Sequence, residues 1–576
     1  MSAGRLGVFV CRCGGNISDH VDVDEVRAAA EAEDGVAVAR AFEFACSDAA
    51  QEEMVAAIRA ERLDAAVVAS CSPKLHLETF RGMARRAGLN PHMYTQVNLR
   101  EQCSWAHRHR PGVTEKAKCL TRAGIARARL GRPLDDIRIE TVPSALVVGA
   151  GPAGMRAALA LAGVGLAVHL VEREAEAGGR IRAWGRLFPR DRTGAEIADS
   201  LLEEIRRRDN IVLYTGAEVV EKKGSVGDFL VKVKAGGQVL SLRVGAIVVA
   251  TGFDPYSPVD GELGRGLPGV LTLPEFKELL ASAAGTIRFE GRPVRTIAYV
   301  YCVGSREPTD DGSAPAHPYC SRYCCTAAVH SAVQAQAIDP ELAQYHLYRD
   351  MRTYGKHELL FEAAGRAGSV FLRFPATEPP VVEADGDRLR VRTRDELAGG
   401  EAIEVPADLV VLVTGMVARE NARLHAALKL PAGAGGFFNE IHPKLRPVET
   451  VIDGVFIAGA AQGPKTLAES VTSALAAAAK SSALLLRGFV DLPPLAARVD
   501  PRACNWCEEC ARACPWEGAI TEVEVDGRAI ASVRPELCKG CGACAPVCAA
   551  GAIELEGYGD AQMMAMIDAA AGREAR

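Results

Sequence analysis

The sequence predicts an α/β fold in three parts, and three observations carry that prediction. Short apolar runs alternate with helical stretches over about residues 1–135, which is typical of a small α/β domain. A strand, a glycine-rich turn and a helix begin a second unit near residue 144, and cysteines crowd the segment after residue 495. We therefore expect domains over 1–135, 143–490 and 495–556, followed by a tail over 557–576.

Composition and charge exclude several classes of protein. The 576 residues are 48% hydrophobic and 24% charged, which is ordinary globular composition. Lysine and arginine number 67 against 73 aspartates and glutamates, so the chain lacks the basic excess of a nucleic-acid-binding protein. No apolar run approaches the roughly 18 residues of a membrane span, and the start has no signal-peptide layout. We expect a cytoplasmic protein.

The 18 cysteines are unevenly distributed along the chain. Six precede residue 120, four lie between Cys302 and Cys325, and eight lie between Cys504 and Cys548. A chain of 61.0 kDa can bury a large core and needs no crosslinks to fold. In a reducing compartment, clustered cysteines are expected to be metal ligands or redox groups.

The eight C-terminal cysteines form two copies of one motif. Each copy has the spacing C-x2-C-x2-C-x3-C, the bacterial ferredoxin pattern for two [4Fe–4S] clusters, in which the fourth cysteine ligates the other cluster. Zinc sites or disulfides are the alternatives, but two complete tandem copies rarely arise by accident. The resemblance to ferredoxins implies electron transfer. The expected ligand sets are Cys504, Cys507, Cys510 and Cys548 for one cluster, and Cys538, Cys541, Cys544 and Cys514 for the other.

The segment from Ser144 to Glu172 has the features of a dinucleotide-binding unit. An apolar strand leads into the spacing G-x-G-x-x-G at Gly149, Gly151 and Gly154, and a helical pattern follows. A second strand ends at Glu172, 23 residues after Gly149. Such glycines let backbone N–H groups approach a pyrophosphate at a helix N-terminus, and the acid hydrogen-bonds a ribose hydroxyl. The alternative is a glycine-rich turn in an α/β core.

Later segments resemble the two-dinucleotide flavoprotein fold of thioredoxin and glutathione reductases, in which the first motif holds FAD. The resemblance covers about residues 143–490 and includes strands that end in Thr251-Gly252 and Thr414-Gly415. One departure is Ala460, where the wider family has an acid that contacts the flavin. The expected FAD-binding residues are Gly149, Gly151, Pro152, Ala153, Gly154, Glu172, Arg173, Gly179, Arg180, Thr251, Gly252, Gly459, Gln462, Gly463 and Lys465.

The second nucleotide site of that fold looks rebuilt, in a nicotinamide subdomain over about residues 265–400. The expected strand is present at Arg295–Tyr301, but no second glycine fingerprint follows it. Cysteines follow instead, and we expect them to hold an iron–sulfur cluster. The alternative is a vicinal thiol pair with a redox or core role. The expected ligands are Cys302, Cys320, Cys324 and Cys325.

The N-terminal domain contains five further candidate ligands. Several of them lie just after apolar strands or before Gly, Ser or Pro turns, where the chain can bend around a ligand. Spacing alone leaves a cluster and buried structural thiols as open alternatives. Cys119, in a predicted helix, is expected to be a bystander. The candidates are Cys11, Cys13, Cys46, Cys71 and Cys103.

Taken together, these segments resemble the A-type subunit of heterodisulfide reductase and its relatives nearly from end to end. The resemblance implies an N-terminal cluster held by four of the five cysteines, and about four [4Fe–4S] clusters in all. It is carried by the strings Val-Cys-Arg-Cys-Gly-Gly-Asn16, Ala-Ser-Cys-Ser-Pro-Lys-Leu-His76, Asn98-Leu-Arg-Glu-Gln-Cys-Ser-Trp105, Tyr-Cys-Val-Gly-Ser-Arg306, Tyr-Cys-Ser-Arg-Tyr-Cys-Cys325, Gln462-Gly-Pro-Lys465, the double ferredoxin run and Gly557-Tyr-Gly-Asp560.

The resemblance implies an FAD and iron–sulfur electron-transfer subunit of a multi-subunit oxidoreductase with a homodimeric core. The implied partners are B- and C-type subunits, a hydrogenase- or dehydrogenase-linked donor, and ferredoxin. Some family members bifurcate electrons, and larger ones carry an inserted ferredoxin module. Residues 225–300 contain no cysteine, so that insert is absent. Flavin-based bifurcation and a simple electron conduit are therefore both open alternatives for this chain. The rival hypotheses are a stand-alone NAD(P)H-dependent flavin oxidoreductase and a non-catalytic iron–sulfur scaffold.

Lys465 is the candidate catalytic residue. It ends the string Gln462-Gly-Pro-Lys465 and precedes a helical stretch over Val471–Ala479. In the related flavoprotein fold, this strand-to-helix turn lies beside the isoalloxazine ring. A lysine ammonium there can donate a hydrogen bond and stabilise negative charge on a reduced flavin. The alternative is a lysine that faces solvent.

Overall fold

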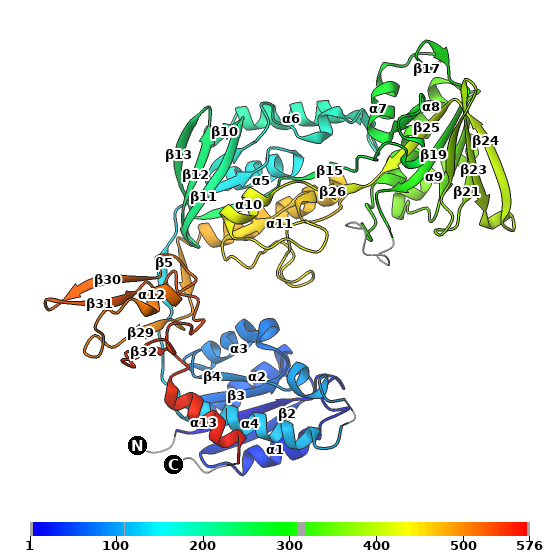
Figure 1. The fold of residues 1–576 in the computed structure, drawn as a ribbon. Coiled ribbons are helices and arrows are strands. Elements are labelled where there is room, and N and C mark those ends of the chain that lie inside the picture. Colours follow the sequence, from blue (N-terminus) through cyan, green and yellow to red (C-terminus); the bar gives the residue numbers. More distant parts are fainter. Residues whose placement is uncertain (1–3, 109, 308–316, 573–576) are drawn as a thin grey trace. The chain divides into compact units, whose positions relative to one another are not determined.

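The computed structural model describes residues 4–108, 110–307 and 317–572 (Figure 1). The last four residues of the expected tail, 573–576, lie outside that range. The chain divides into two compact units, of which the first combines Met1–Ile139 with Asp491–Arg576 and the second is Glu140–Val490. The expected N-terminal and ferredoxin domains thus fall together in the first unit. No helix among the described residues is long and apolar enough to cross a membrane.

A four-stranded parallel sheet with the order β2-β1-β3-β4 forms the N-terminal part of the first unit. Strands β1 and β3 are buried at every residue, as expected for a parallel sheet that is covered on both faces. Helices α1 and α4 pack on one face, and α2 and α3 pack on the other. The elements are β1 (Leu6–Cys11), α1 (Val23–Glu31), β2 (Val36–Phe42), α2 (Asp48–Ala60), β3 (Ala65–Ser70), α3 (Pro73–Ala87), β4 (Tyr94–Asn98), the π-helical turn η1 (Arg100–Ser104) and α4 (Val113–Arg129).

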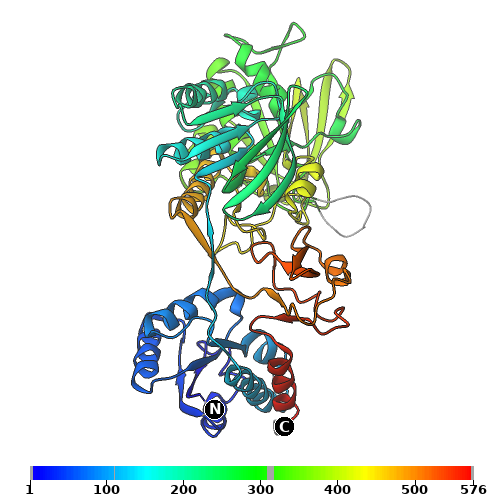
Figure 2. The same ribbon diagram turned by 90° about the vertical axis from the view of Figure 1, so that its left-hand side faces the viewer.

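The C-terminal part of the first unit contains the cysteine-rich module and a final helix. Helix α13 lies along α4 in both views (Figures 1 and 2). Arg127 of α4 donates to the Gly557 carbonyl at 2.9 Å, and its guanidinium lies 4.1 Å from the ring centroid of Tyr558. Much of the expected tail is therefore a helix anchored on the N-terminal domain. The elements are β29 (Ala497–Val499), α12 (Glu509–Ala513), β30 (Ile520–Val525), β31 (Arg528–Val533), β32 (Ile553–Leu555) and α13 (Asp560–Ala570).

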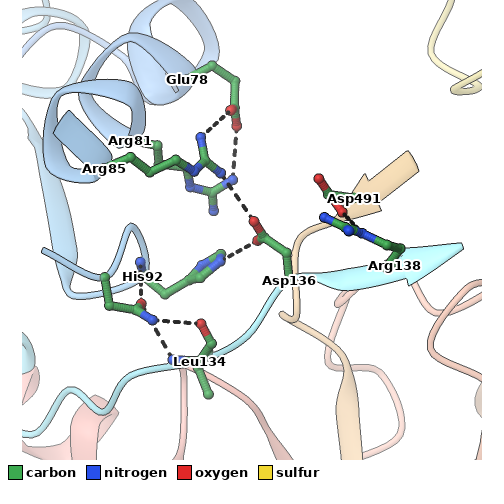
Figure 3. A network of polar contacts seen from close by, with 9 residues as sticks. Glu78, Arg81, Arg85, His92, Leu134, Asp136, Arg138 and Asp491 are labelled. Carbon is green, nitrogen blue, oxygen red and sulfur yellow. Dashed lines mark hydrogen bonds and ion pairs between the residues drawn. The ribbon is translucent and has the colours of Figure 1, made fainter. Parts of the chain in front are cut away.

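A polar network fixes the segment that follows α4 to the N-terminal domain (Figure 3). Asp136 contacts the buried His92 Nε2 at 2.7 Å and accepts from Arg85 at 3.2 Å. Glu78 in turn accepts from Arg81 at 3.0 Å and lies 3.9 Å from Arg85. These contacts hold the chain in place just beyond the expected domain boundary at residue 135.

The second unit begins with a five-stranded parallel sheet of order β10-β7-β6-β14-β27. Helices α5, α6 and α11 contribute to its core. An antiparallel sheet, β11-β12-β13, adjoins it through contacts of β13 with β6 and of β11 with β7. The elements are β6 (Ser144–Val148), α5 (Pro152–Gly163), β7 (Ala167–Val171), η2 (Arg180–Ala183), β8 (Arg186–Leu187), β9 (Arg192–Thr193), α6 (Gly194–Arg206), β10 (Ile211–Tyr214), β11 (Ala217–Ser225), β12 (Asp228–Ala235), β13 (Gln238–Val244), β14 (Ala246–Val249), α10 (Ala422–Leu428), β27 (Val455–Ile457), η6 (Gly459–Ala461) and α11 (Leu467–Leu485).

A second parallel sheet, of order β16-β25-β19-β20-β21, forms a subdomain inside this unit. The chain enters this subdomain through β15 and leaves it through β26, and these two strands pair in antiparallel fashion. Strand β25 pairs with both β16 and β19, so the sheet extends past residue 400. The elements are β15 (Phe253–Pro255), η3 (Glu262–Gly264), β16 (Val270–Thr272), α7 (Leu273–Ser282), β17 (Arg288–Phe289), β18 (Arg292–Pro293), β19 (Thr296–Val303), α8 (Cys324–Ile338), β20 (Ala343–Tyr348), η4 (Gly355–His357), α9 (Glu358–Arg366), β21 (Val370–Arg373), β22 (Val381–Asp385), β23 (Arg388–Asp395), η5 (Glu396–Ala398), β24 (Glu401–Ala407), β25 (Leu409–Thr414) and β26 (Met416–Ala418). The strands β5 (Ile137–Glu140) and β28 (Phe489–Leu492) complete the chain.

Candidate functional site

A cavity of about 1160 Å³ lies within the second unit. Its wall includes the glycine-rich turn after β6 and, from the second subdomain, residues of helices α7 and α8. Among the expected FAD-binding residues, the cavity is not lined by Gly154, Gly459, Gln462 or Gly463. The expected residues that do line it are Gly149, Gly151, Pro152, Ala153, Glu172, Arg173, Gly179, Arg180, Thr251, Gly252 and Lys465.

The three glycines after β6 differ in what surrounds them. Gly149 has a φ of +103°, and a Cβ there would lie 2.4 Å from the Ala250 carbonyl oxygen. A Cβ on Gly154 would lie 1.8 Å from the Gly149 oxygen, so this glycine lets helix α5 pack closely on the turn. A Cβ on Gly151 would meet nothing nearer than the Gly179 Cα at 4.0 Å. The open space at Gly151, at the N-terminus of α5, fits a pyrophosphate group.

Glu172 ends β7 and is tied to the glycine-rich turn. Its carboxylate accepts from the Ala150 N–H at 2.7 Å and from the Glu174 N–H at 3.0 Å. The residue is 5% exposed and lines the cavity. A carboxylate has about four acceptor positions, so two backbone donors leave capacity for a ribose hydroxyl. The site therefore fits the adenosine half of FAD.

The turn after β27 holds Lys465 at the cavity wall. Gln462 donates to Glu440 at 2.7 Å and to the Pro447 carbonyl at 2.8 Å, which fixes its amide. The Gln462 oxygen then accepts from Lys465 Nζ at 3.0 Å. Burial lowers the pKa of Lys465. Gly459, at the start of this turn, has a φ of +66° and approaches α5 closely, since its Cβ would lie 2.7 Å from the Ala153 Cβ.

Several cavity residues escaped the sequence analysis. Trp184 stacks on Tyr323 with a centroid distance of 5.4 Å, and it lies 5.5 Å from the Phe253 ring. Lys277 of α7 and His330 of α8 line the same cavity. No local motif marks these residues, because they come from separate loops and helices that meet only in the folded chain.

The four cysteines of the second subdomain lie together. Cys302 is in β19, where its φ of +63° accompanies a register shift against β25. Cys324 and Cys325 begin α8, and the Cys324 thiol lies close enough to the other three thiols to interact with their charges. The hydrogen bond that Cys324 donates lowers the pKa of Cys325. The Arg322 N–H donates to the Cys320 sulfur at 3.3 Å.

The turn that follows β19 is occupied by an aromatic ring. Gly304 has a φ of +65°, and a Cβ on it would lie 2.0 Å from Cγ of Tyr256. The Tyr256 hydroxyl donates to Glu262 at 3.0 Å, which holds the ring against the turn. In a dinucleotide-binding unit this space would belong to the pyrophosphate.

Four of the five N-terminal cysteines come together, and Cys103 does not. The Cys13 thiol interacts electrostatically with Cys11, Cys46 and Cys71. Cys103 is fully buried on the other side of the sheet, where its thiol donates to the Val113 carbonyl at 3.3 Å.

A guanidinium borders the N-terminal group of thiols. Arg100 Nη1 donates to the Cys13 sulfur at 3.5 Å, and its positive charge also acts on Cys46 and Cys71. Such a cation favours thiolates, which are the form that binds iron. Burial opposes this effect of Arg100 and raises the pKa of Cys71 to about 12. Metal ions would therefore have to displace the proton of this thiol.

The C-terminal cysteines receive hydrogen bonds from the backbone. The sulfurs of Cys504, Cys538 and Cys548 accept N–H groups at 3.3, 3.4 and 3.2 Å, and such bonds tune iron–sulfur clusters. Cys510 lies near Cys504 and Cys507, and Cys544 lies near Cys538 and Cys541. Within the described ranges, no three Cys, His, Asp or Glu side chains lie close enough together to hold a single metal ion. A cubane cluster does not need such a group, because each of its four thiolates binds a different iron atom.

Two family models match the chain. The model described as pyridine nucleotide-disulphide oxidoreductase matches residues 143–294, and the 4Fe-4S dicluster domain matches residues 496–561. The first covers the glycine-rich turn and Glu172, and the second covers all eight C-terminal cysteines. FAD and [4Fe–4S] clusters are accordingly the cofactors of this protein.

Among solved structures, the chain is similar to thioredoxin reductases. That of T. acidophilum is 15% identical and has a TM-score of 0.41, and the alignment covers 60% of this chain and 99% of that one. The Lactococcus lactis enzyme is 16% identical with a TM-score of 0.41, and the coverage is 60% and 100%.

Curated relatives match the chain along nearly its whole length. The second iron-sulfur A-type subunit of CoB–CoM heterodisulfide reductase from Methanopyrus kandleri is 35% identical over 91% of this chain and 92% of the relative. The iron-sulfur A-type subunit of the same enzyme from Methanocaldococcus jannaschii is 34% identical over 98% of each chain. A protein of Archaeoglobus profundus that is named as like this subunit is 31% identical over 90% and 91%. The chain is an oxidoreductase that belongs to the family of heterodisulfide reductase A-type subunits.

Proposed function

We propose that the chain is the FAD- and iron–sulfur-dependent electron-transfer subunit of a multi-subunit, heterodisulfide reductase-like complex. When bound, the flavin exchanges electron pairs and the clusters exchange single electrons. The relatives are named as lettered subunits of their enzymes, and that of Methanothermobacter marburgensis is named for a heterodisulfide,ferredoxin reductase. These names support a partner-dependent role.

One observation carries this proposal, namely what replaces the nicotinamide site. The Tyr256 ring fills the turn after β19, where a second dinucleotide would need space for its pyrophosphate. Cys324 and Cys325 begin the helix that follows. Their neighbours along the chain, Tyr323 and Thr326, line the flavin cavity. A cluster on these cysteines would therefore lie beside the flavin, in a position to exchange electrons with it in place of NAD(P)H.

We further propose that Cys11, Cys13, Cys46 and Cys71 hold the N-terminal cluster. Their mutual proximity and the Arg100 hydrogen bond to Cys13 support this set. A cluster of four thiolates carries excess negative charge, which the guanidinium would offset. Cys103 would remain a buried structural thiol.

Serine variants test this ligand set. Cys71→Ser should remove or alter one cluster signal in the electron paramagnetic resonance spectrum of the reduced protein, while Cys103→Ser should leave all signals intact. Cys119→Ser, a half-buried thiol of α4, is a matched control. Loss of a signal in Cys103→Ser but not in Cys71→Ser would contradict the proposed set.

Flavin-based bifurcation would need a second outlet for a low-potential electron. The alignment with the first A-type subunit of Methanopyrus kandleri spans 656 positions, whereas this chain has 576 residues, so the relative has residues that this chain lacks. Residues 225–300 also contain no cysteine. Both observations favour a single electron route from the flavin through the bound clusters.

Anaerobic purification of the native complex tests the proposed function. We expect other subunits to co-purify, and we expect the flavin absorbance to bleach with a donor that needs those subunits but not with NADH or NADPH. Bleaching by NADH within one turnover would favour a stand-alone flavin oxidoreductase. If dithionite bleached neither the flavin nor the clusters, the scaffold hypothesis would replace the proposal. Ferredoxin reduction coupled to a high-potential acceptor would contradict the single route.

A further inference from the structure

Lys277 is a buried cation that the proposed function does not use. It lies on α7, is 6% exposed and lines the flavin cavity. Its Nζ donates to the Arg186 carbonyl at 3.1 Å. Among the residues that the structure describes, none forms an ion pair with Lys277. The negative charge of Asp191 acts on Lys277 from a distance, and the Asp191 side chain is largely exposed.

Two arginines of the cavity wall, in contrast, have acidic partners. Arg180 pairs with Asp254 at 2.5 Å, and Arg419 pairs with Glu174 at 3.3 Å. Burying a charge without a counterion costs several kcal/mol. A negatively charged group bound in the cavity would therefore offset part of this cost for the Lys277 ammonium.

The hydrogen bond to Arg186 does not by itself explain a lysine. Arg186 belongs to a flap, residues 184–193, that is also held to the second subdomain by Gln334, which donates to Asp191 at 3.1 Å. The Phe188 ring of the flap packs edge-on against His330 at 5.9 Å. A neutral donor at position 277 would make the same bond to a carbonyl without the cost of burying a charge.

The charge state of Lys277 would respond to a charged group that enters the cavity. Burial lowers its pKa to about 8, so the ammonium form persists at neutral pH but is weakly held. Burial, with a further contribution from Lys277, lowers the pKa of His330 to about 4. His330 is therefore neutral at pH 7 and supplies no competing positive charge.

We propose that Lys277 is a second cationic group of the flavin site, which stabilises the negative charge that FAD gains on reduction. FAD that takes up two electrons from its donor and one proton from solvent gains one negative charge. An ammonium that lines the same cavity favours that charged form over the neutral oxidised form. This inference rests on the proposed function, because it needs FAD in this cavity.

Variants of Lys277 test the inference through the flavin midpoint potential, measured by anaerobic spectroelectrochemical titration. Lys277→Met removes the charge, Lys277→Gln removes it but keeps a donor for Arg186, and Lys277→Arg keeps it. Lys234→Met, at an exposed lysine that also lines the cavity, is the matched control. The FAD content of each variant is measured first.

We expect the two neutral variants to bind reduced FAD at least tenfold more weakly relative to oxidised FAD, which lowers the midpoint potential by about 30 mV for a two-electron couple. Lys277→Arg and Lys234→Met should stay near the wild type. If Lys277→Met does not fold, Lys277→Gln decides. An unchanged potential in a neutral variant that retains FAD overturns the inference and leaves the proposed function standing. Wild-type protein without FAD would instead overturn the proposed function.

Discussion

Gly151 offers the sharpest test of where the dinucleotide binds. Its φ of −77° and ψ of 180° are ordinary for an L-residue, and a Cβ there would be 4.0 Å from the Gly179 Cα, the nearest atom beyond its two chain neighbours. Gly151→Ala and Gly151→Val should therefore change the free energy of unfolding of the apoprotein by no more than about 0.5 kcal/mol. The added side chain points instead into the space at the helix N-terminus where the pyrophosphate would approach the backbone.

The expected loss of FAD affinity follows from the hydrogen bonds that the side chain would block. A hydrogen bond to a charged group contributes about 1.5 to 3 kcal/mol, so each one lost weakens binding by about 10- to 150-fold. Gly151→Ala should lie near the lower figure, and Gly151→Val should exceed it. Titration of flavin-free protein with FAD, followed by quenching of flavin fluorescence, measures the dissociation constant.

Two further glycines of α5 serve as controls. Gly154→Ala would put its Cβ 1.8 Å from a carbonyl oxygen, so this variant should lower the midpoint of thermal unfolding before any selective effect on FAD. Gly163→Ala, whose Cβ would meet nothing within 4 Å, should bind FAD like the wild type. Wild-type affinity in Gly151→Val would refute the assignment of the pyrophosphate to this turn.

Three other predictions can be checked independently. Anaerobic iron analysis should find about sixteen iron atoms per chain, from four cubanes; about eight would mean that only the C-terminal module is filled. Lys465→Ala should lower the flavin potential, by about 1 to 3 kcal/mol of lost stabilisation, while FAD stays bound; an unchanged potential would remove Lys465 from the flavin site. Arg265 holds the pKa of Glu275 at about 2, so the folded state binds this proton less readily than the unfolded chain, and stability should fall as pH drops from about 4.5 towards 2. Because the Glu275 side chain is 40% exposed, we expect it to contribute about 1 kcal/mol to the free energy of unfolding at neutral pH. Urea unfolding of Glu275→Gln at neutral pH should show a free energy of unfolding that is lower by this amount.

The N-terminal cysteines show what sequence spacing could not decide. Cys11 ends β1, Cys71 directly follows β3, and Cys46 lies four residues after β2. The carboxyl ends of parallel strands meet at one edge of a sheet, so these residues converge although they are far apart in the chain. Cys103 also follows a strand, but its thiol turns into the core beneath α4. Cys103 lies within the π-helical turn η1, and its side chain packs in the cluster that contains α1 and α4.

The glycine-rich turn and the double ferredoxin motif could be predicted from the amino-acid sequence, because each depends on residues within a few positions of one another. A turn that needs glycines, or a loop that wraps thiolates around a cluster, has its geometry encoded in local spacing. The folded chain was needed to find the Tyr256 ring in front of Gly304, the burial of Lys277 beside the flap, and the return of α13 to α4. These features join segments that are distant in sequence, and their energies come from packing and desolvation, which no short pattern of residues encodes.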